Sequence, residues 1–194
     1  MSVHLPGLAE GVLTWARNRY IFARWPDFVV GADAEGGPYL LRWYVTPWRR
    51  WREQAEANPT AWRRLKAAVA KWLPNLYVHL FLRDDDDRAL HDHPSWACLI
   101  LDGTYLEHTI ADGGIHQRRS WDAGSLRFLP TRHTHRIELP TVGDESDIRV
   151  PCVTLFLFGP AVREWGFHCP QRGWVHWRDF TAPGRPGEVG GGCD

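Results

Sequence analysis

The chain has 194 residues, of which 44% are hydrophobic, and these values suit one globular domain with its own core. Lys plus Arg and Asp plus Glu number 23 each, so the formal net charge is zero. This balance removes the usual electrostatic argument for a nucleic-acid-binding protein. No apolar stretch approaches the roughly eighteen residues that a transmembrane helix needs, so no membrane partner is expected.

The four cysteines bear on the cellular compartment. Cys98, Cys152, Cys169 and Cys193 form no CxxC pair, and the N-terminal segment lacks the charged and apolar regions of a signal peptide. Cysteines in a reducing cytoplasm stay free. We therefore expect a cytoplasmic protein with free thiols, in which Cys193 has no role.

Helical and extended segments alternate in an N-terminal extension, residues 1–74. Apolar residues at helical spacing predict helical structure over 8–24 and over 48–73. A turn-rich segment between them predicts a strand pair at 28–30 and 39–45.

From residue 75 onward the pattern changes to short strands separated by turns. Seven such strands at regular spacing are typical of an all-β sandwich or barrel. They are predicted at residues 76–82, 96–101, 104–110, 115–119, 126–129, 135–139 and 150–158. The sequence thus predicts a single domain over 1–180, made of the extension, a barrel core at 75–160 and a closing segment at 161–180, followed by a flexible Gly/Pro-rich tail at 181–194.

Two histidine-containing stretches carry the chemistry. In a strand, residues two apart point to the same face, so His91 and His93 can present two imidazoles to one point. His135 follows a strand and a Pro-containing turn, and on a closed barrel it can face the first pair. Imidazole nitrogens suit iron, nickel, copper and zinc. The three histidines are therefore candidate ligands of one divalent metal.

These stretches resemble the two motifs of the cupin superfamily. The pair His91 and His93 is followed by a glycine that opens the next strand, as in the first motif. The second motif is a Gly, then PxGxxH, which Gly124, Pro130 and His135 fit, although an arginine replaces its second glycine. This alignment selects His135 over His133, which becomes either a hydrogen-bonding neighbour of a ligand or a surface residue.

The acid of the first cupin motif is missing, because its place holds Ala97 and Cys98. This departure resembles the thiol dioxygenases, the family of cysteine dioxygenase, which use three His ligands and no acid. The similarity covers residues 75–160 at the level of motifs. It implies a mostly β fold, a cupin-type jelly-roll β-barrel with N-terminal helices, and Fe(II) as cofactor.

The resemblance breaks on the last barrel strand. The family carries an inward Ser, His and Tyr there, and the matching positions are Thr154, Phe156 and Phe158. Phe158 has no hydroxyl, so it cannot cross-link to a cysteine or donate a hydrogen bond. Cys98 is then open to the plainer interpretation of a buried thiol.

Further pocket residues follow from the resemblance and from strand alternation. Arg42 is the nearest counterpart of the family's carboxylate-binding arginine, and Arg83 competes with it. His79 alternates with Arg83 on one strand face, which points either into the barrel or toward the N-terminal helices. Trp96 is expected to shape a dry pocket together with Phe156 and Phe158.

Tyr105 and Glu107 share a strand face near the expected site. Glu107 can orient a ligand imidazole from behind, as carboxylates commonly do. After the last strand, Arg163 and His168 in the closing segment are weaker pocket candidates.

Two charged segments have competing interpretations. The acidic run 84–87 is either a solvated turn or a salt-bridged loop at the barrel mouth, and it is a poor candidate for metal ligation. The basic aromatic segments 48–52 and 62–64 either stack on nucleic-acid bases or form an amphipathic helix with Trp inward and Arg outward. The balanced total charge favours the helix.

The leading hypothesis is a non-haem Fe(II) dioxygenase that acts on a small substrate and O2. If the substrate is a thiol, its product is a sulfinic acid. Two alternatives stay open: another metal-dependent cupin enzyme, an isomerase, lyase or ring-cleaving dioxygenase using Fe, Ni, Mn or Zn, and a non-catalytic cupin that binds a small molecule. A monomer or a homodimer is expected.

Overall fold

The computed structural model describes residues 2–34, 36–85, 89–94, 96–143, 148–160, 163–185, 187–188 and 190–193. Of Trp96 it describes the backbone alone.

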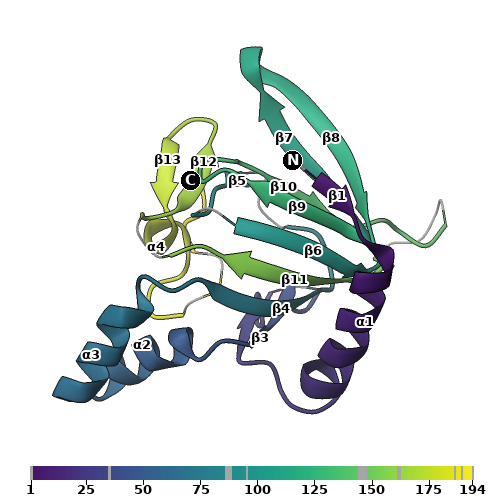
Figure 1. The fold of residues 1–194 in the computed structure, drawn as a ribbon. Helices are drawn as coiled ribbons and strands as arrows, with labels where there is room; N and C mark the ends of the chain where they lie inside the picture. The colour runs from purple at the N-terminus through teal and green to yellow at the C-terminus, as the bar shows by residue number, and fades with distance from the viewer. Residues whose placement is uncertain are drawn as a thin grey trace.

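Eight consecutive strands form two facing layers. The first layer has the order β9-β6-β11-β4, and the second contains β10-β7-β8 and β5 (Figure 1). An antiparallel bridge between His91 and His135 joins β5 to the β10 end of the second layer, giving β5-β10-β7-β8. The strands are β4 (Asn75–Phe81), β5 (Leu90–His91), β6 (Trp96–Asp102), β7 (Thr104–Ala111), β8 (Ile115–Asp122), β9 (Ser125–Leu129), β10 (Arg136–Glu138) and β11 (Cys152–Phe158). The short 3-10 turn η2 (Asp112–Gly114) links β7 to β8.

Eight strands divided between two four-stranded sheets in this order make a jelly roll. The predicted mostly β jelly-roll barrel with N-terminal helices is therefore confirmed. The barrel interior is filled by aromatic and aliphatic side chains from both layers, among them Tyr77, Ile100, Tyr105 and Ile137. Alternation along each strand places these residues inside.

The N-terminal extension widens the first layer and covers its outer face. Strand β1 pairs with β9, and β3 and β2 continue the sheet beyond β4. Helix α1 and the π-helical turn η1 pack on the outside of this sheet, where Ala9 and Ala16 meet Val78, Leu99 and Val153. The elements are β1 (Ser2–His4), α1 (Pro6–Ala16), η1 (Arg17–Ile21), β2 (Phe28–Val30) and β3 (Leu40–Tyr44).

Two antiparallel helices, α2 (Trp48–Ala57) and α3 (Ala61–Ala70), follow β3 and project from one corner of the barrel (Figure 1). The predicted helical region 48–73 is thus two helices. Thr60 accepts a hydrogen bond from the backbone N–H of Arg63 and so caps the start of α3. None of the helices in the described residues is long and apolar enough to cross a membrane.

The closing segment adds strands that the sequence did not predict. Strand β12 (Gly166–Cys169) pairs with β5 and with β13 (Gly173–His176), and α4 (Trp177–Phe180) follows. Phe180 stacks on Phe167 with ring centroids 3.6 Å apart. The segment therefore packs directly against the strand that carries His91.

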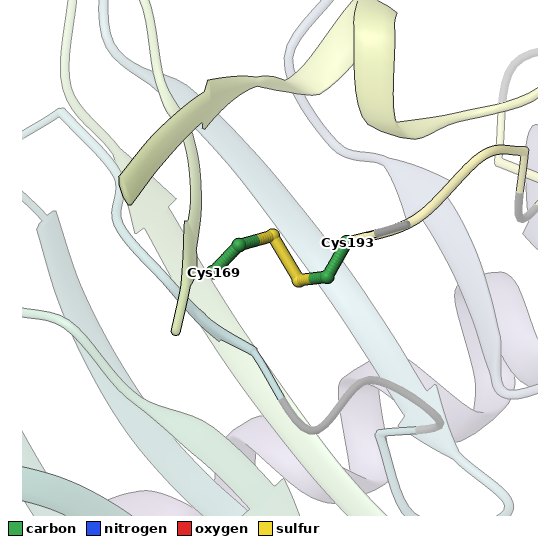
Figure 2. Close-up of a disulfide and its surroundings, with 2 residues drawn as sticks. All are labelled: Cys169 and Cys193. Atoms are coloured by element: carbon green, nitrogen blue, oxygen red, sulfur yellow. A yellow bond between two sulfur atoms is a disulfide. The ribbon is translucent and has the colours of Figure 1, made fainter. Parts of the chain in front are cut away.

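A disulfide joins Cys169, at the end of β12, to Cys193 in the tail (Figure 2). The expectation of free thiols is wrong for these two residues and correct for Cys98 and Cys152, which are buried. The tail that was expected to be loose is also hydrogen-bonded to the barrel, because the Gly31 N–H donates to the Gly187 carbonyl at 2.8 Å. Pairing across 24 residues of sequence is not readable from spacing alone.

Candidate metal centre

Three histidines meet at the wall of the barrel interior. His91 ends β5, His93 follows two residues later, and His135 immediately precedes β10. One nitrogen of each ring lies within 4.8 Å of one nitrogen of each of the others, close enough for the three to hold one metal ion. The three residues predicted from the motifs therefore do converge.

The backbone fixes two of the three rings. The His91 N–H donates to the His135 carbonyl at 2.9 Å, and the His135 N–H donates to the His91 carbonyl at 3.0 Å. Such a reciprocal pair sets two residues directly opposite each other on neighbouring strands. Their ring centroids lie 4.9 Å apart as a result.

Carboxylates lie behind both of these rings. Glu107 on β7 accepts a hydrogen bond from Nδ1 of His135 at 2.8 Å, and Asp85 Oδ2 lies 3.7 Å from Nδ1 of His91. The hydrogen bond to Nδ1 leaves Nε2 of His135 as the nitrogen that can bind a metal. Asp85 lies beyond hydrogen-bond distance, so Nδ1 of His91 has no hydrogen bond within the described residues. Glu107 thus lies where strand alternation placed it, whereas Asp85 was assigned to a charged turn.

Glu107 is the centre of a buried polar network. Its Oε1 bonds to Nε2 of His133 at 3.1 Å as well as to His135, and its Oε2 accepts from Trp121 Nε1 at 3.1 Å and from Arg127. Burial by itself raises the pKa of the Glu107 carboxyl, but the hydrogen bonds from His133 and His135 and the charge of Arg127 outweigh it and hold the pKa well below its ordinary value. Glu107 is therefore a carboxylate at neutral pH.

Two of the three candidate ligand rings, those of His91 and His93, are neutral at the same pH. Burial lowers the pKa of His91 to about 4, against the opposing effect of Asp85. Burial and the neighbouring His91 and His135 lower the pKa of His93 well below its usual value. Metal binding requires deprotonated imidazole, so these rings need lose no proton to bind a metal at neutral pH.

A cavity of about 160 Å³ opens beside the three histidines. Cavities of this order accept ligands the size of a small aromatic ring. Its walls include all three histidines together with most of the predicted pocket residues: Arg42, His79, Arg83, Cys98, Tyr105, Phe156 and Phe158. The side chain of Trp96, also predicted here, lies outside the described residues.

Arg42 and His79 form a pair on the β3–β4 side of this cavity. Arg42 Nε donates to Nε2 of His79 at 2.9 Å, so the proton of the neutral His79 ring is on Nδ1. Nδ1 is buried and has no hydrogen-bond partner among the described residues. Burial, with the charge of Arg42, lowers the pKa of His79 well below its usual value. The strand face that carries His79 therefore points into the barrel, which is one of the two orientations that the sequence left open.

Arg42 forms no ion pair in the described part of the chain. Its guanidinium lies over the rings of Tyr77, 5.1 Å from the centroid, and Phe28, at 5.8 Å. Arg83 differs, because its Nε donates to the Gly37 carbonyl at 2.8 Å. Both arginines that the sequence proposed for a substrate carboxylate therefore line the cavity, and Arg42 has no acidic partner within the described residues.

The remaining walls are apolar or weakly polar. Phe158, Phe156 and Trp165 surround the His93 ring with centroid distances of 5.6, 6.0 and 5.4 Å. Burial raises the pKa of the Cys98 thiol to about 11, so it is protonated at neutral pH. The Tyr105 hydroxyl accepts a hydrogen bond from Arg127 at 2.8 Å.

Two polar residues of the closing segment, Arg163 and His168, make contacts outside the cavity. Arg163 donates to Asp92 at 2.6 Å and to the Thr131 carbonyl at 2.6 Å, and His168 lies 3.5 Å from the same aspartate. Arg163 and His168 line a separate surface depression, not the cavity beside the three histidines. They tie the loop after His91 to the closing segment.

The acidic run is only partly a solvated turn. Asp84 accepts the backbone N–H of Leu139 at 2.7 Å, and Asp85 accepts that of Ile137 at 3.1 Å. Both side chains thus anchor the strand next to His135, and the last two acids of the run lie outside the described residues. Sequence reasoning also missed Trp165, whose tryptophan-rich segment was the one available signal.

No protein-family model matches the chain, and no curated protein matches it by sequence. Solved structures with some similarity include an oxalate decarboxylase of Lactobacillus farciminis in a formate complex, at 14% identity and a TM-score of 0.39 over 66% of this chain and 30% of that one. Another is a Bacillus subtilis oxalate decarboxylase described for its Mn(II) centres, at 16% identity and a TM-score of 0.40 over 75% and 30%. This chain spans about 30% of the length of each. Scores this low carry no argument, and the fold assignment rests on the strand order above.

Proposed function

We propose that this protein is a cupin metalloenzyme, a non-haem Fe(II) dioxygenase whose substrate is a small molecule with an anionic group. The observation that supports it most is the set of three converging imidazoles, two of them buried and that of His93 partly buried, at the wall of a cavity that also contains Arg42. An all-nitrogen donor set suits iron, nickel or zinc, whereas manganese favours oxygen ligands.

In this proposal His91, His93 and His135 hold the metal. Glu107 keeps the ring of His135 in the orientation that exposes Nε2, and the Asp85 carboxylate lies 3.7 Å from Nδ1 of His91. A bound Fe(II) supplies the redox chemistry that allows O2 to react with an organic substrate, and three protein ligands leave coordination positions free for both.

The substrate is positioned by the opposite side of the cavity. Arg42 offers an uncompensated positive charge, and His79 offers a buried N–H at Nδ1. The Arg42 guanidinium suits a carboxylate, and Nδ1 of His79, on the other edge of the ring from the nitrogen bonded to Arg42, is a separate hydrogen-bond donor. Phe156, Phe158 and Trp165 exclude water from the volume between this anchor and the histidines.

A thiol is the first substrate class to test, because a small acid that carries a thiol can place its sulfur toward the histidines while Arg42 holds its carboxylate. Oxidation of the thiol by O2 to a sulfinic acid places both oxygen atoms in the product and balances without another reductant. Cys98, with its pKa raised to about 11, is then a protonated wall residue.

The test has two stages. Purified protein is expected to contain one metal per chain by elemental analysis. His91→Ala should lose the metal, and the exposed His116→Ala on β8 should keep it. Equal metal content in both variants would contradict the site.

Fe(II)-loaded protein is then offered a panel of small thiols and small carboxylic acids while O2 uptake is recorded. Uptake with a carboxylate-bearing thiol supports the proposal. Full metal occupancy without O2 uptake for any compound would overturn the dioxygenase and leave the site to one of the other metal-dependent cupin reactions, or to binding alone.

A further inference from the structure

Helix α3 exposes an apolar stripe to solvent. Trp62, Leu65, Val69 and Trp72 are 62, 55, 50 and 71% exposed. Their spacing of three and four residues places them along one face of the helix and its final turn. Single exposed apolar residues are ordinary, but four in a row on one face need an explanation.

The rest of the fold does not cover this stripe. The buried side of α3 is formed by Ala70, and α3 packs mainly against α2. The pair projects away from the barrel (Figure 1). The sequence-based prediction that the tryptophans of these helices point inward is therefore wrong for Trp62.

The charges of α3 are all of one sign. Arg63, Arg64, Lys66 and Lys71 lie between Pro59 and Pro74 with no Asp or Glu among them. None of the four forms an ion pair within the described part of the chain.

Only one of these cations borders the stripe. At about 100° per residue, Lys66 lies beside one edge, whereas Arg64 and Lys71 lie roughly 80–100° past the other edge, on the exposed polar side of the helix. The Lys66 ammonium lies 5.2 Å from the Trp62 ring centroid, which fixes it beside the stripe.

We propose that α3 is a docking element for an anionic lipid surface, on which it lies with its apolar stripe inserted among the headgroups. A helix with tryptophan and aliphatic residues on one face and unopposed lysine and arginine on its polar side has the composition of an interfacial helix. The two tryptophans stand at either end of the stripe, and tryptophan favours the boundary between water and lipid.

Two other occupants fit less well. A second copy of the chain would bring four like charges against four. A nucleic acid would find phosphate partners, but Leu65 and Val69 offer its bases no ring to stack on. The apolar half of the surface is thus explained best by lipid.

The experiment is co-sedimentation of the full-length protein with phosphatidylcholine vesicles, with and without phosphatidylserine. Binding is expected only to vesicles that contain phosphatidylserine, and it should weaken as salt is added. Replacing both cations in Arg64→Gln/Lys71→Gln should weaken binding roughly 30-fold, because each basic residue near such a surface contributes about fivefold. The matched control is Arg19→Gln, an exposed arginine on η1, which should bind as wild type does.

A second pair of variants tests the apolar stripe. Leu65→Ser/Val69→Ser should reduce binding by about tenfold or more, whereas Trp25→Ser, which alters a 90% exposed tryptophan elsewhere, should not. All these positions are exposed, so unfolding temperatures should stay close to wild type.

Three results would overturn the proposal. The first is equal sedimentation with both kinds of vesicle, and the second is wild-type binding by the α3 variants. The third is a protein that does not bind vesicles but does bind an oligonucleotide, or dimerises as its concentration rises. If the α3 variants abolish that binding or dimerisation, the surface belongs to the nucleic acid or to the second copy. Each readout is independent of metal content and O2 uptake.

Discussion

The two sides of the cavity are built differently. On the histidine side, Glu107 bonds to His133, His135, Trp121 and Arg127. On the arginine side, Arg42 has no acidic partner within the described residues, and Nδ1 of His79 has no hydrogen bond there.

This difference in hydrogen bonding suggests that one side of the cavity orients the metal ligands and the other binds a substrate. A satisfied buried network is rigid, and it holds ligand rings in one orientation. Buried polar groups without partners are costly, and proteins keep them where a ligand completes them. The network around Glu107 therefore fixes the His135 ring before anything binds, although Nδ1 of His91, like Nδ1 of His79, has no hydrogen bond within the described residues. In the proposed function, a ligand completes the arginine side.

Removing the charge of Glu107 should break the histidine side. Glu107→Gln leaves the buried Arg127 without its carboxylate, which is expected to lower the free energy of unfolding by about 3–5 kcal/mol. Metal affinity should fall roughly 10- to 100-fold because His135 loses its orienting acceptor. Denaturant unfolding and metal titration measure the two effects. The exposed pair of Glu164 with His176 supplies the control, since Glu164→Gln should change neither. Similar values for both variants would show that the network is not structural.

The pH dependence of the stability of the metal-free protein should show that the His91 ring is buried and neutral. The pKa of His91 in the folded state is about 4, below its ordinary value of 6.5, so between these pH values the unfolded chain binds a proton that the folded chain does not. Stability should therefore fall as the pH drops through this window, by up to about 3 kcal/mol from this ring. His91→Phe should flatten the profile recorded by thermal unfolding, and His116→Ala should not. Identical profiles for wild type and His91→Phe would contradict the buried, neutral ring.

The disulfide should matter for the arginine side, because the tail that it holds places Gly187 in the cavity wall. A crosslink that closes a 24-residue separation stabilises by about 3 kcal/mol through the entropy of the unfolded chain. Cys193→Ser and Cys169→Ser should each lose this amount, and the double variant should lose no more. Wild-type stability in the presence of a thiol reductant, with both cysteines shown to be reduced, would be the contrary result.

Arg42 should affect ligand binding and leave the metal in place. Arg42→Met removes the charge and keeps an apolar stem, so a small carboxylate should bind roughly 10- to 150-fold more weakly, the range of one hydrogen bond to a charged group. Metal content should match wild type, and Arg42→Lys should recover part of the affinity. Calorimetry with the metal-loaded protein measures this. A loss of metal in Arg42→Met would show that the two sides are not separate.

The sequence predicts the histidine side better than the arginine side, and the reason is physical. His91 and His93 are neighbours in sequence, and the turn before His135 is local, so their spacing carries the geometry. Glu107 follows from strand alternation. Asp85 and Trp165 could not be predicted, because their positions depend on pairings between distant segments.

A periodic sequence pattern can predict the apolar face of a helix, but it does not predict whether other residues cover that face. Periodicity predicted the apolar face of α3, but only the packing of α3 against α2 shows that this face is exposed. The same limit applies to Cys169 and Cys193, since four cysteines allow several pairings and the choice is made by the fold.

The central claim is that one metal ion sits among His91, His93 and His135. Crystals of the protein grown with Fe(II) under anaerobic conditions, with diffraction recorded on both sides of the iron absorption edge, test it directly. The account predicts one anomalous peak within bonding distance of a nitrogen of each of the three rings. A fully ordered site without a peak, or a peak held by other residues, would contradict it.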